Sequence, residues 1–250
     1  MNIFQELSKF DFVKYFDKNH TYEIDGKPAR GTSRFLGEFK KPFDSERIAE
    51  KESLKTGETI EAVLARWKFK ADRACHKGHL FHSFAENLDA NKIFPYEDSI
   101  GYDKEKLLKE LKILEELYRR FREDTKDILI PVVSELVVGS REFNLCGTID
   151  KIFYNTRKGV YQVFDWKTNE KFTTENRFSR FLDPISHLDE SKLNTYSLQL
   201  SAYRLILERT TEIPFGDSVA VWFDSSKAIY KPIKMKDLRT DILKMLEKKP

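Results

Sequence analysis

Two aspartates and a lysine fall on two neighbouring expected strands, and together these three side chains could bind a metal ion and catalyse hydrolysis. Asp150 ends the segment Gly147-Thr148-Ile149-Asp150, and the next strand carries Asp165-Trp166-Lys167. Because strand side chains alternate between faces, Asp165 and Lys167 point the same way. Two carboxylates suit Mg²⁺ or Mn²⁺, which would acidify a water and stabilise charge on a phosphoryl oxygen. The lysine could orient or deprotonate that water, or balance the developing charge.

The residues between the two strands predict a hairpin that places the aspartates opposite each other. The stretch 155–159 is rich in turn residues. If the hairpin is symmetric about Arg157 and Lys158, the two aspartates become cross-strand partners. Their Cβ atoms would then lie roughly 5 Å apart, where like charges are destabilising. A divalent cation would offset this repulsion. The alternative is a pair of surface acids, each matched with a lysine.

Glu135 and His82 are further candidate residues of the site. Glu135 interrupts the apolar run from Val132 to Val138, and an ionised carboxylate inside a sheet is costly unless it is paired or metal-bound. A third acid facing the site and an edge residue facing solvent are both consistent with this position. His82 shares a helical stripe with His79 and Glu86, and imidazole is a ready metal ligand. A structural or solvated histidine is the alternative.

Two other segments carry residues that could bind substrate. Gln199 and Tyr203 are spaced i, i+4 on an expected helix, with Tyr196 on the same stripe. They could hydrogen-bond the lysine or a phosphate, or form the polar edge of a packed helix.

Residues 169–192 are polar and irregular, and too long for an ordinary loop. Their mixture of bases and aromatics, including Arg177, Phe178 and Arg180, is typical of places where single-stranded bases stack and phosphates are neutralised. A solvated loop with hydrophobic anchors is the alternative.

Hydrophobic periodicity predicts an α/β or α+β fold with one central sheet. We expect a hairpin over 20–34 that turns at Asp25-Gly26, with Thr32-Ser33 as a helix cap. The other expected elements are helices over 44–92, 103–123 and 193–208, strands over 132–138, 145–154, 160–166, 218–223 and 228–233, and a charged C-terminal helix.

Composition limits the classes of protein that need to be considered. Of the 250 residues, 40% are hydrophobic and 34% are charged, with a net charge of +3, which permits a polyanionic partner without requiring one. The two cysteines, Cys75 and Cys146, cannot supply a four-thiolate cluster, and we expect both to be buried thiols in a reducing compartment. No apolar run is long enough for a membrane span, and the N-terminal residues do not read as a signal or transit peptide.

The order of these motifs resembles the PD-(D/E)XK nuclease superfamily. The RecB-like branch fits best, and residues 164–171 are similar to the mitochondrial genome maintenance exonuclease and its phage and bacterial relatives. The chain lacks the cysteines that hold an iron–sulfur cluster in some RecB-like relatives, which favours the cluster-free group. The proline of the family name is missing before Asp150, as is common in this branch. The matching motifs are Gly78 to His82, Glu135, Gly147 to Asp150, Asp165-Trp166-Lys167, and Gln199 to Tyr203.

The resemblance implies a restriction-endonuclease-like core in a single nuclease domain over 1–250. A helical portion, 1–125, would carry the histidine motif, and 126–250 would form the catalytic sheet. The implied metal ligands are His82, Asp150, Asp165 and the backbone carbonyl of Trp166. The implied catalytic residues are Lys167, Asp165, Asp150 and Glu135. The candidate substrate-binding residues are Gln199, Tyr203, Tyr196, Glu86, Arg177, Phe178 and Arg180.

We therefore expect a Mg²⁺- or Mn²⁺-dependent DNA exonuclease that trims single-stranded ends or flaps in DNA repair, recombination or replication. A bacterial or phage-encoded cytoplasmic protein is expected, without a membrane partner; a helicase or recombinase partner is not readable from the chain. Two alternatives stay open. One is a structure-specific or restriction-type endonuclease with the same core, and the other is a non-catalytic nucleic-acid-binding module.

Overall fold

Eight strands form one mixed sheet in the computed structural model, which describes residues 2–90, 92 and 103–248. The spatial order is β1-β2-β3-β5-β6-β7-β8, and β4 pairs with the other edge of β5. The strands are β1 (Val13–Phe16), β2 (Thr21–Ile24), β3 (Lys27–Gly31), β4 (Leu129–Ser140), β5 (Leu145–Asn155), β6 (Val160–Lys167), β7 (Val219–Asp224) and β8 (Ile229–Lys234).

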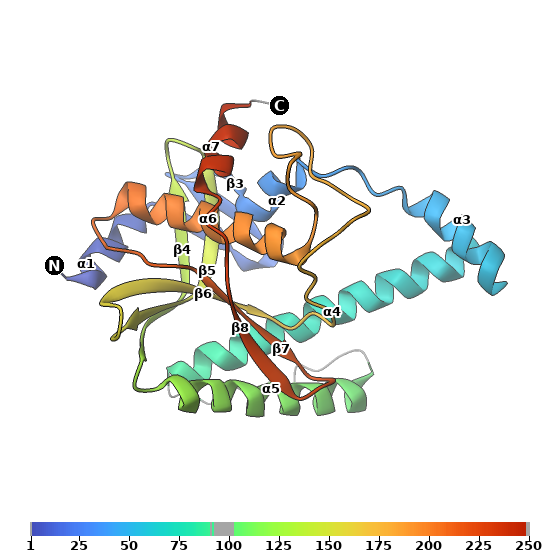
Figure 1. Ribbon diagram of the computed structural model, residues 1–250, viewed down its shortest axis with the longest axis horizontal. Coiled ribbons are helices and arrows are strands. Elements are labelled where there is room, and N and C mark those ends of the chain that lie inside the picture. Colours follow the sequence, from blue (N-terminus) through green and yellow to red (C-terminus); the bar gives the residue numbers. More distant parts are fainter. Residues whose placement is uncertain (1, 91, 93–102, 249–250) are drawn as a thin grey trace.

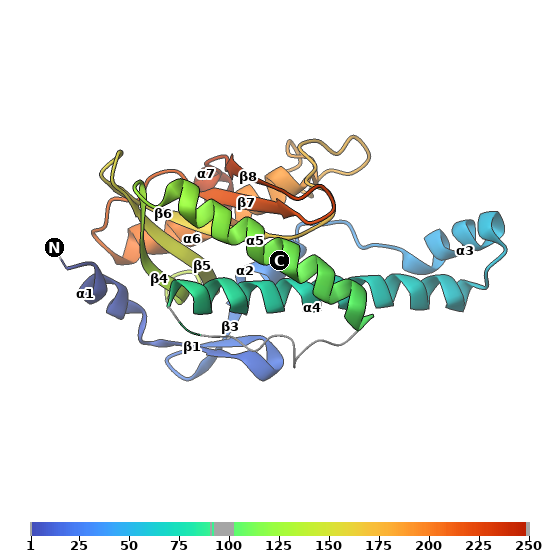
Figure 2. The same cartoon turned by 90° about the horizontal axis from the view of Figure 1, so that it is seen from below.

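Helices cover both faces of this sheet (Figures 1 and 2). The described helices are α1 (Ile3–Leu7), α2 (Thr32–Gly37), α3 (Ser45–Thr56), α4 (Ile60–Asp89), α5 (Lys104–Thr125), α6 (Lys192–Thr210) and α7 (Arg239–Glu247). One apolar core joins α1, α2, α6 and α7 to the sheet, and a second, rich in aromatic rings, joins α4 and α5 to it. The expected α/β architecture, with a central mixed sheet flanked by helices, is confirmed.

Alternation along the strands separates the two cores. Val163 contributes to the α6 side, while Phe164 and Trp166 pack on the α4–α5 side. Asp165 has the same parity as Val163, so it points toward α6.

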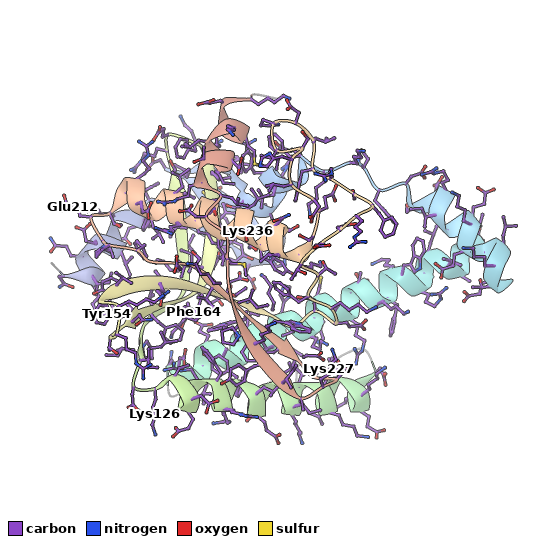
Figure 3. All side chains as sticks on the ribbon, viewed as in Figure 1. Lys126, Tyr154, Phe164, Glu212, Lys227 and Lys236 are labelled. Atoms are coloured by element: carbon purple, nitrogen blue, oxygen red, sulfur yellow. The ribbon has the colours of Figure 1, made fainter. Side chains whose placement is uncertain are left out.

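Lys126 lies beyond the C-terminal end of α5, and Lys227 lies at the turn of the β7–β8 hairpin alongside α5 (Figure 3).

The predicted hairpin register is confirmed. Strands β5 and β6 pair antiparallel from Asn155↔Val160 to Lys151↔Phe164. The next positions in this register are Asp150 and Asp165, as a turn centred on residues 157 and 158 requires.

The β5 strand has a gap in its pairing on one edge. Its other edge is occupied by β4 along its whole length. On the gapped edge, β3 pairs parallel with Leu145 and Cys146, whereas β6 pairs only from Lys151 onward. The two neighbours therefore diverge, and residues 147–150 lie in the fork between them. A fork of this kind exposes backbone and side-chain polar groups inside a sheet, where a site can be built.

Three local expectations are wrong. Gly31 rather than Thr32-Ser33 is the N-cap of α2; Thr32 lies in the helix, and its hydroxyl donates to the Cys146 carbonyl at 2.8 Å. Cys146 is buried as expected, but Cys75 is exposed because it lies on the outer side of α4. The helix expected to reach residue 92 ends at Asp89 as α4, and residue 91 of that prediction lies outside the described residues.

The α3 helix and the first half of α4 extend away from the sheet as an arm (Figures 1 and 2). Arg66 holds the arm together by pairing with Glu52 at 2.7 Å and with Glu58 at 2.6 Å. Phe69 is exposed on the arm, and Phe43 is exposed in the segment that leads into it. Across the described residues, no helix has the length and apolar character needed to cross a membrane.

A buried charge network fixes α4 and α5 against β5. Lys151 Nζ lies 2.8 Å from Asp89 Oδ2, and both side chains are at most 5% exposed. Tyr118 donates to the same carboxylate oxygen at 2.8 Å, and Arg122 Nε lies 3.2 Å from Oδ1. Lys151 also donates to Ser134 on β4. The network therefore sets the position of α4 relative to the strand that carries Asp150.

We expect Asp89→Ala to lower the free energy of unfolding by about 3–5 kcal/mol, because it leaves the Lys151 ammonium buried beside an uncompensated guanidinium. Urea denaturation followed by circular dichroism measures this change. Glu105→Ala, which breaks an exposed pair with Lys109, is the matched control and should change stability by less than about 0.5 kcal/mol. Equal effects of the two substitutions would contradict the role given to the network.

Candidate active site

Both aspartates predicted to bind metal are buried at the fork. Asp150 is 9% exposed and Asp165 is 2% exposed, so neither is a surface hairpin acid. Asp150 Oδ2 accepts a hydrogen bond from the backbone N–H of Trp166 at 2.6 Å. The side chain of Asp150 thus bridges β5 and β6 at the point where the two strands separate.

Glu135 joins Asp150 from the opposite strand. The register pairs Ser134 with Lys151 and Leu136 with Ile149, which places Glu135 across from Asp150. Glu135 has φ +49°, the left-handed region that a non-glycine residue seldom adopts inside a strand. Such strain persists where the surrounding structure imposes it, and it is common at functional sites.

Three ligand atoms gather at this point. Those of His82, Glu135 and Asp150 lie within 4.8 Å of one another. The Nδ1 atom of His82 lies 3.5 Å from Asp150 Oδ1, and Nε2 lies 3.2 Å from the Trp166 carbonyl oxygen. The sequence left two orientations open for Glu135, toward the site or toward solvent, and the structure shows the one that faces the site. His82 reaches the fork from α4, on the opposite side of the sheet from α6.

Lys167 and Asp165 face each other beside this group. Lys167 Nζ lies 2.5 Å from Asp165 Oδ2, an oxygen that has no hydrogen bond of good geometry. The ammonium also lies 4.5 Å from the ring centroid of Tyr196 on α6. The hydroxyl of Tyr196 donates to Asn169 just after β6. Tyr196 thus restricts the lysine side chain from the α6 side.

Gln199 and Tyr203 support the fork rather than the lysine. The Gln199 amide donates to the Tyr203 hydroxyl at 3.0 Å, and Tyr203 is buried. Its ring lies against Gly147 of β5, where an added Cβ would lie 2.2 Å from Tyr203 Cε1. Only glycine permits this close approach, so the glycine of the G-x-x-D segment allows α6 to pack against the fork.

Close packing of like charges shifts the pKa values of the acids. Burial, reinforced by Asp150, raises the pKa of Glu135 to about 8. Burial raises the pKa of Asp165 to about 6, against the opposing charge of Lys167. Burial disfavours ionisation of Asp150, but the positive charge of the His82 imidazolium outweighs burial and lowers the pKa of Asp150. Desolvation opposes charging of His82, yet Asp150 raises its pKa to about 9. The cluster thus holds protons that a cation could replace.

Comparison with known families decides the assignment. The family model of the PD-(D/E)XK nuclease superfamily matches residues 43–242. The chain belongs to this superfamily. A search of curated proteins gives no match. Membership implies metal-dependent nuclease activity on DNA, and PD-(D/E)XK nucleases use divalent metals.

The donors at the fork fit a divalent cation of the kind that this superfamily uses. Glu135, Asp150 and the Trp166 carbonyl offer hard oxygens, and His82 adds one nitrogen. Oδ2 of Asp165, which faces the Lys167 ammonium, is a further buried acceptor nearby. The predicted ligand set contained Asp165 and left Glu135 among the catalytic acids. The geometry groups Glu135 with His82 and Asp150 and turns Asp165 toward Lys167.

Four of the predicted substrate-binding residues lie outside this cluster. Glu86 is exposed on α4, and its charge contributes to the raised pKa of Glu135, so it borders the site. Arg177 and Arg180 make their ion pair and hydrogen bond within the 169–192 segment, to Glu175 and to a backbone carbonyl. Phe178 is fully exposed. Their assignment to DNA binding stays a prediction.

Several residues near the site were missed by sequence reasoning. The Tyr22 hydroxyl lies 3.0 Å from Thr148 Oγ1 inside the fork. Lys192 lies 5.8 Å from the Tyr196 ring. Burial lowers the pKa of Lys192, and the positive charges of Lys40 and Lys167 lower it further. Tyr22 was expected only as part of the 20–34 hairpin, and the two lysines carry no local pattern that would have marked them.

We expect metal affinity at this PD-(D/E)XK site to rise with pH, because protons on Glu135 and Asp165 compete with the cation. The proton on Asp165 is lost as pH passes about 6, and that on Glu135 as pH passes about 8. Below pH 8, affinity should fall by up to about tenfold per pH unit for each proton displaced. Titration calorimetry with Mn²⁺ between these values measures the slope. Glu135→Gln should flatten it, and a pH-independent affinity would contradict the shared-proton arrangement.

Proposed function

We propose that this protein is a DNA exonuclease of the RecB-like, cluster-free branch that hydrolyses phosphodiester bonds at single-stranded ends or flaps. Its setting would be DNA repair, recombination or replication in a cytoplasmic compartment. The observation that carries the proposal is the meeting of Asp150, Glu135 and His82 at the fork, with Asp165 and Lys167 beside them. These side chains bring acidic ligands and a cationic group to one point, as metal-assisted phosphodiester hydrolysis requires.

Each group has a role in the proposed reaction. Lys167 is an ammonium, because Asp165 and Asp150 raise its pKa in spite of burial. As a cation it would orient the attacking water and stabilise the charge that develops on the phosphoryl oxygens. Asp165 holds the ammonium in place, while Asp150 and Glu135 supply acidic ligands. A bound Mg²⁺ or Mn²⁺ would supply acidification of water and Lewis-acid stabilisation of the phosphate.

Three lysines near the N-terminal end of α6 support binding of a polyanion. Burial lowers the pKa of Lys192 most, and the positive charges of Lys40 and Lys167 lower it further. The three positive charges therefore lie close to one another. Repulsion among them would be relieved by phosphates of a bound strand, which would also release counterions. Arg177 and Arg180 would extend this contact along the 169–192 segment.

The arm and the 169–192 segment would guide a single strand to the site. The segment packs against the chain that leads into the arm: the backbone N–H of Leu182 donates to the Phe39 carbonyl at 2.8 Å. Lys40 Nζ lies 5.6 Å from the Phe181 ring. Exposed aromatics at Phe178 and Phe69 would stack on unpaired bases. An unpaired end could thread between these elements, which favours end-dependent cleavage.

The proposal is tested with end-labelled linear and circular single-stranded DNA in Mg²⁺, in Mn²⁺ and in EDTA. We expect metal-dependent loss of the linear substrate only, with the label position giving the polarity. Cleavage of the circle would replace the exonuclease with an endonuclease. Binding without cleavage of either substrate, by a folded sample, would favour a non-catalytic binding module.

We expect Lys167→Ala and Asp165→Ala each to reduce the cleavage rate at least about 100-fold while leaving DNA affinity largely intact. Lys167 acts on the reacting phosphate and Asp165 acts through Lys167, while Lys40, Lys192 and the 169–192 segment keep most of the contact with the flanking strand. Lys126→Ala is the matched control, because Lys126 is an exposed lysine on the far side of the molecule that pairs with Glu123. Wild-type rates in the Lys167 and Asp165 variants would exclude the assigned chemistry.

A further inference from the structure

A cavity of about 370 Å³ lies directly beside the fork. Its outer wall comes from β1, β2 and the residues between them, with Tyr15, His20 and Tyr22 in its lining. Its inner wall is formed by Gly147 and Tyr203, which also define the fork. Its volume falls in the range of small-ligand sites. None of the roles assigned above uses this space.

The lining combines aromatic rings with hydrogen-bonding groups. Tyr15 and Tyr22 have ring centroids 4.9 Å apart, and the Tyr15 hydroxyl lies 2.6 Å from His20 Nδ1. The His20 ring in turn lies 5.5 Å from that of His79 on α4. Arg34 of α2 reaches the cavity and makes no ion pair among the residues that the structure describes. The cavity thus offers aromatic rings to a flat apolar group and a guanidinium to an anion.

The cavity adjoins the segment of β5 that leads to Asp150. The Tyr22 hydroxyl lies 3.0 Å from Thr148 Oγ1, and Thr148 has the same strand parity as Asp150. Gly147 precedes Asp150 by three residues, roughly 10 Å along a strand. The charge of Glu135 adds to the burial that raises the pKa values of Tyr15 and Tyr22. A strand whose phosphate lies at Asp150 would therefore place a neighbouring nucleotide at the cavity.

We propose that this cavity binds one unpaired nucleotide of the substrate strand, within two positions of the scissile phosphate. Its base stacks on the rings of Tyr22 and Tyr15, and Arg34 neutralises its phosphate. A base can reach these walls only when its pairing edge is free, so the cavity selects single-stranded over paired DNA at this position. The inference rests on the proposed nuclease function and assigns the substrate-contacting subsite of that same site.

The test scans one abasic residue through a linear single-stranded oligonucleotide and measures the cleavage rate at each bond. We expect the rate to fall about tenfold at the bond that lies a fixed number of nucleotides from the abasic residue, because base–aromatic stacking contributes a factor of about this size per base. Uniform rates at every bond would overturn the proposal.

Variants separate stacking from folding. Tyr22→Ala should cut intact DNA about tenfold more slowly, and the abasic residue should then have no further effect. Tyr22→Phe keeps the ring and should retain full sensitivity to the abasic residue. Tyr154→Ala, on the distant end of β5 (Figure 3), should leave the position dependence unchanged. Undiminished abasic sensitivity in Tyr22→Ala would overturn the proposal.

A binding measurement distinguishes failure of the subsite from failure of the nuclease assignment. In EDTA, an oligonucleotide carrying 2-aminopurine at the sensitive position should lose fluorescence on binding to the wild type, and much less on binding to Tyr22→Ala. When the protein cuts no DNA, the same probe is moved through every position. Quenching at one position that depends on Tyr22 supports the subsite even then, whereas no such position overturns it.

Discussion

The hydrogen bond from the Trp166 backbone to Asp150 Oδ2 marks the constraint on which the site depends. It lies where β6 leaves β5, between the last β5–β6 pair and the short parallel pairing with β3. Continuous pairing along β5 would bury its edge and leave no room for ligands. Because the pairing stops, a carboxylate takes the place of a backbone acceptor, and the Trp166 carbonyl lies within reach of His82.

The fork concentrates charge at a cost in stability. Glu135 and Asp165 both have raised pKa values, so ionising either carboxyl costs more free energy in the folded protein than in the unfolded chain. Glu135 also adopts the left-handed backbone conformation. Unfolding releases these protons, so the contribution of these two acids to the stability of the metal-free fold falls as pH rises toward 8. The buried Asp89–Lys151 network and the Tyr203–Gly147 contact hold the surrounding elements in place against this cost. A bound cation would remove much of it.

Sequence reasoning was accurate where the determinants are local. The β5–β6 register follows from strand alternation and a short turn, so the meeting of Asp150 and Asp165 could be predicted. The side that Glu135 faces could not, because its positive φ breaks the alternation on which such a prediction depends. Tyr22 was missed because its partner, Thr148, is distant in the sequence. Cys75 is exposed because it lies on the uncovered side of α4, and which side is covered depends on how distant elements pack on this helix.

The central claim is that the fork is the cation site of a nuclease. Anomalous diffraction from crystals grown with Mn²⁺ above pH 8 tests it most directly, since the acids are then free to bind metal. The account predicts a strong anomalous peak between Glu135, Asp150 and the Trp166 carbonyl. An empty fork, with Mn²⁺ bound elsewhere or not at all, would contradict it.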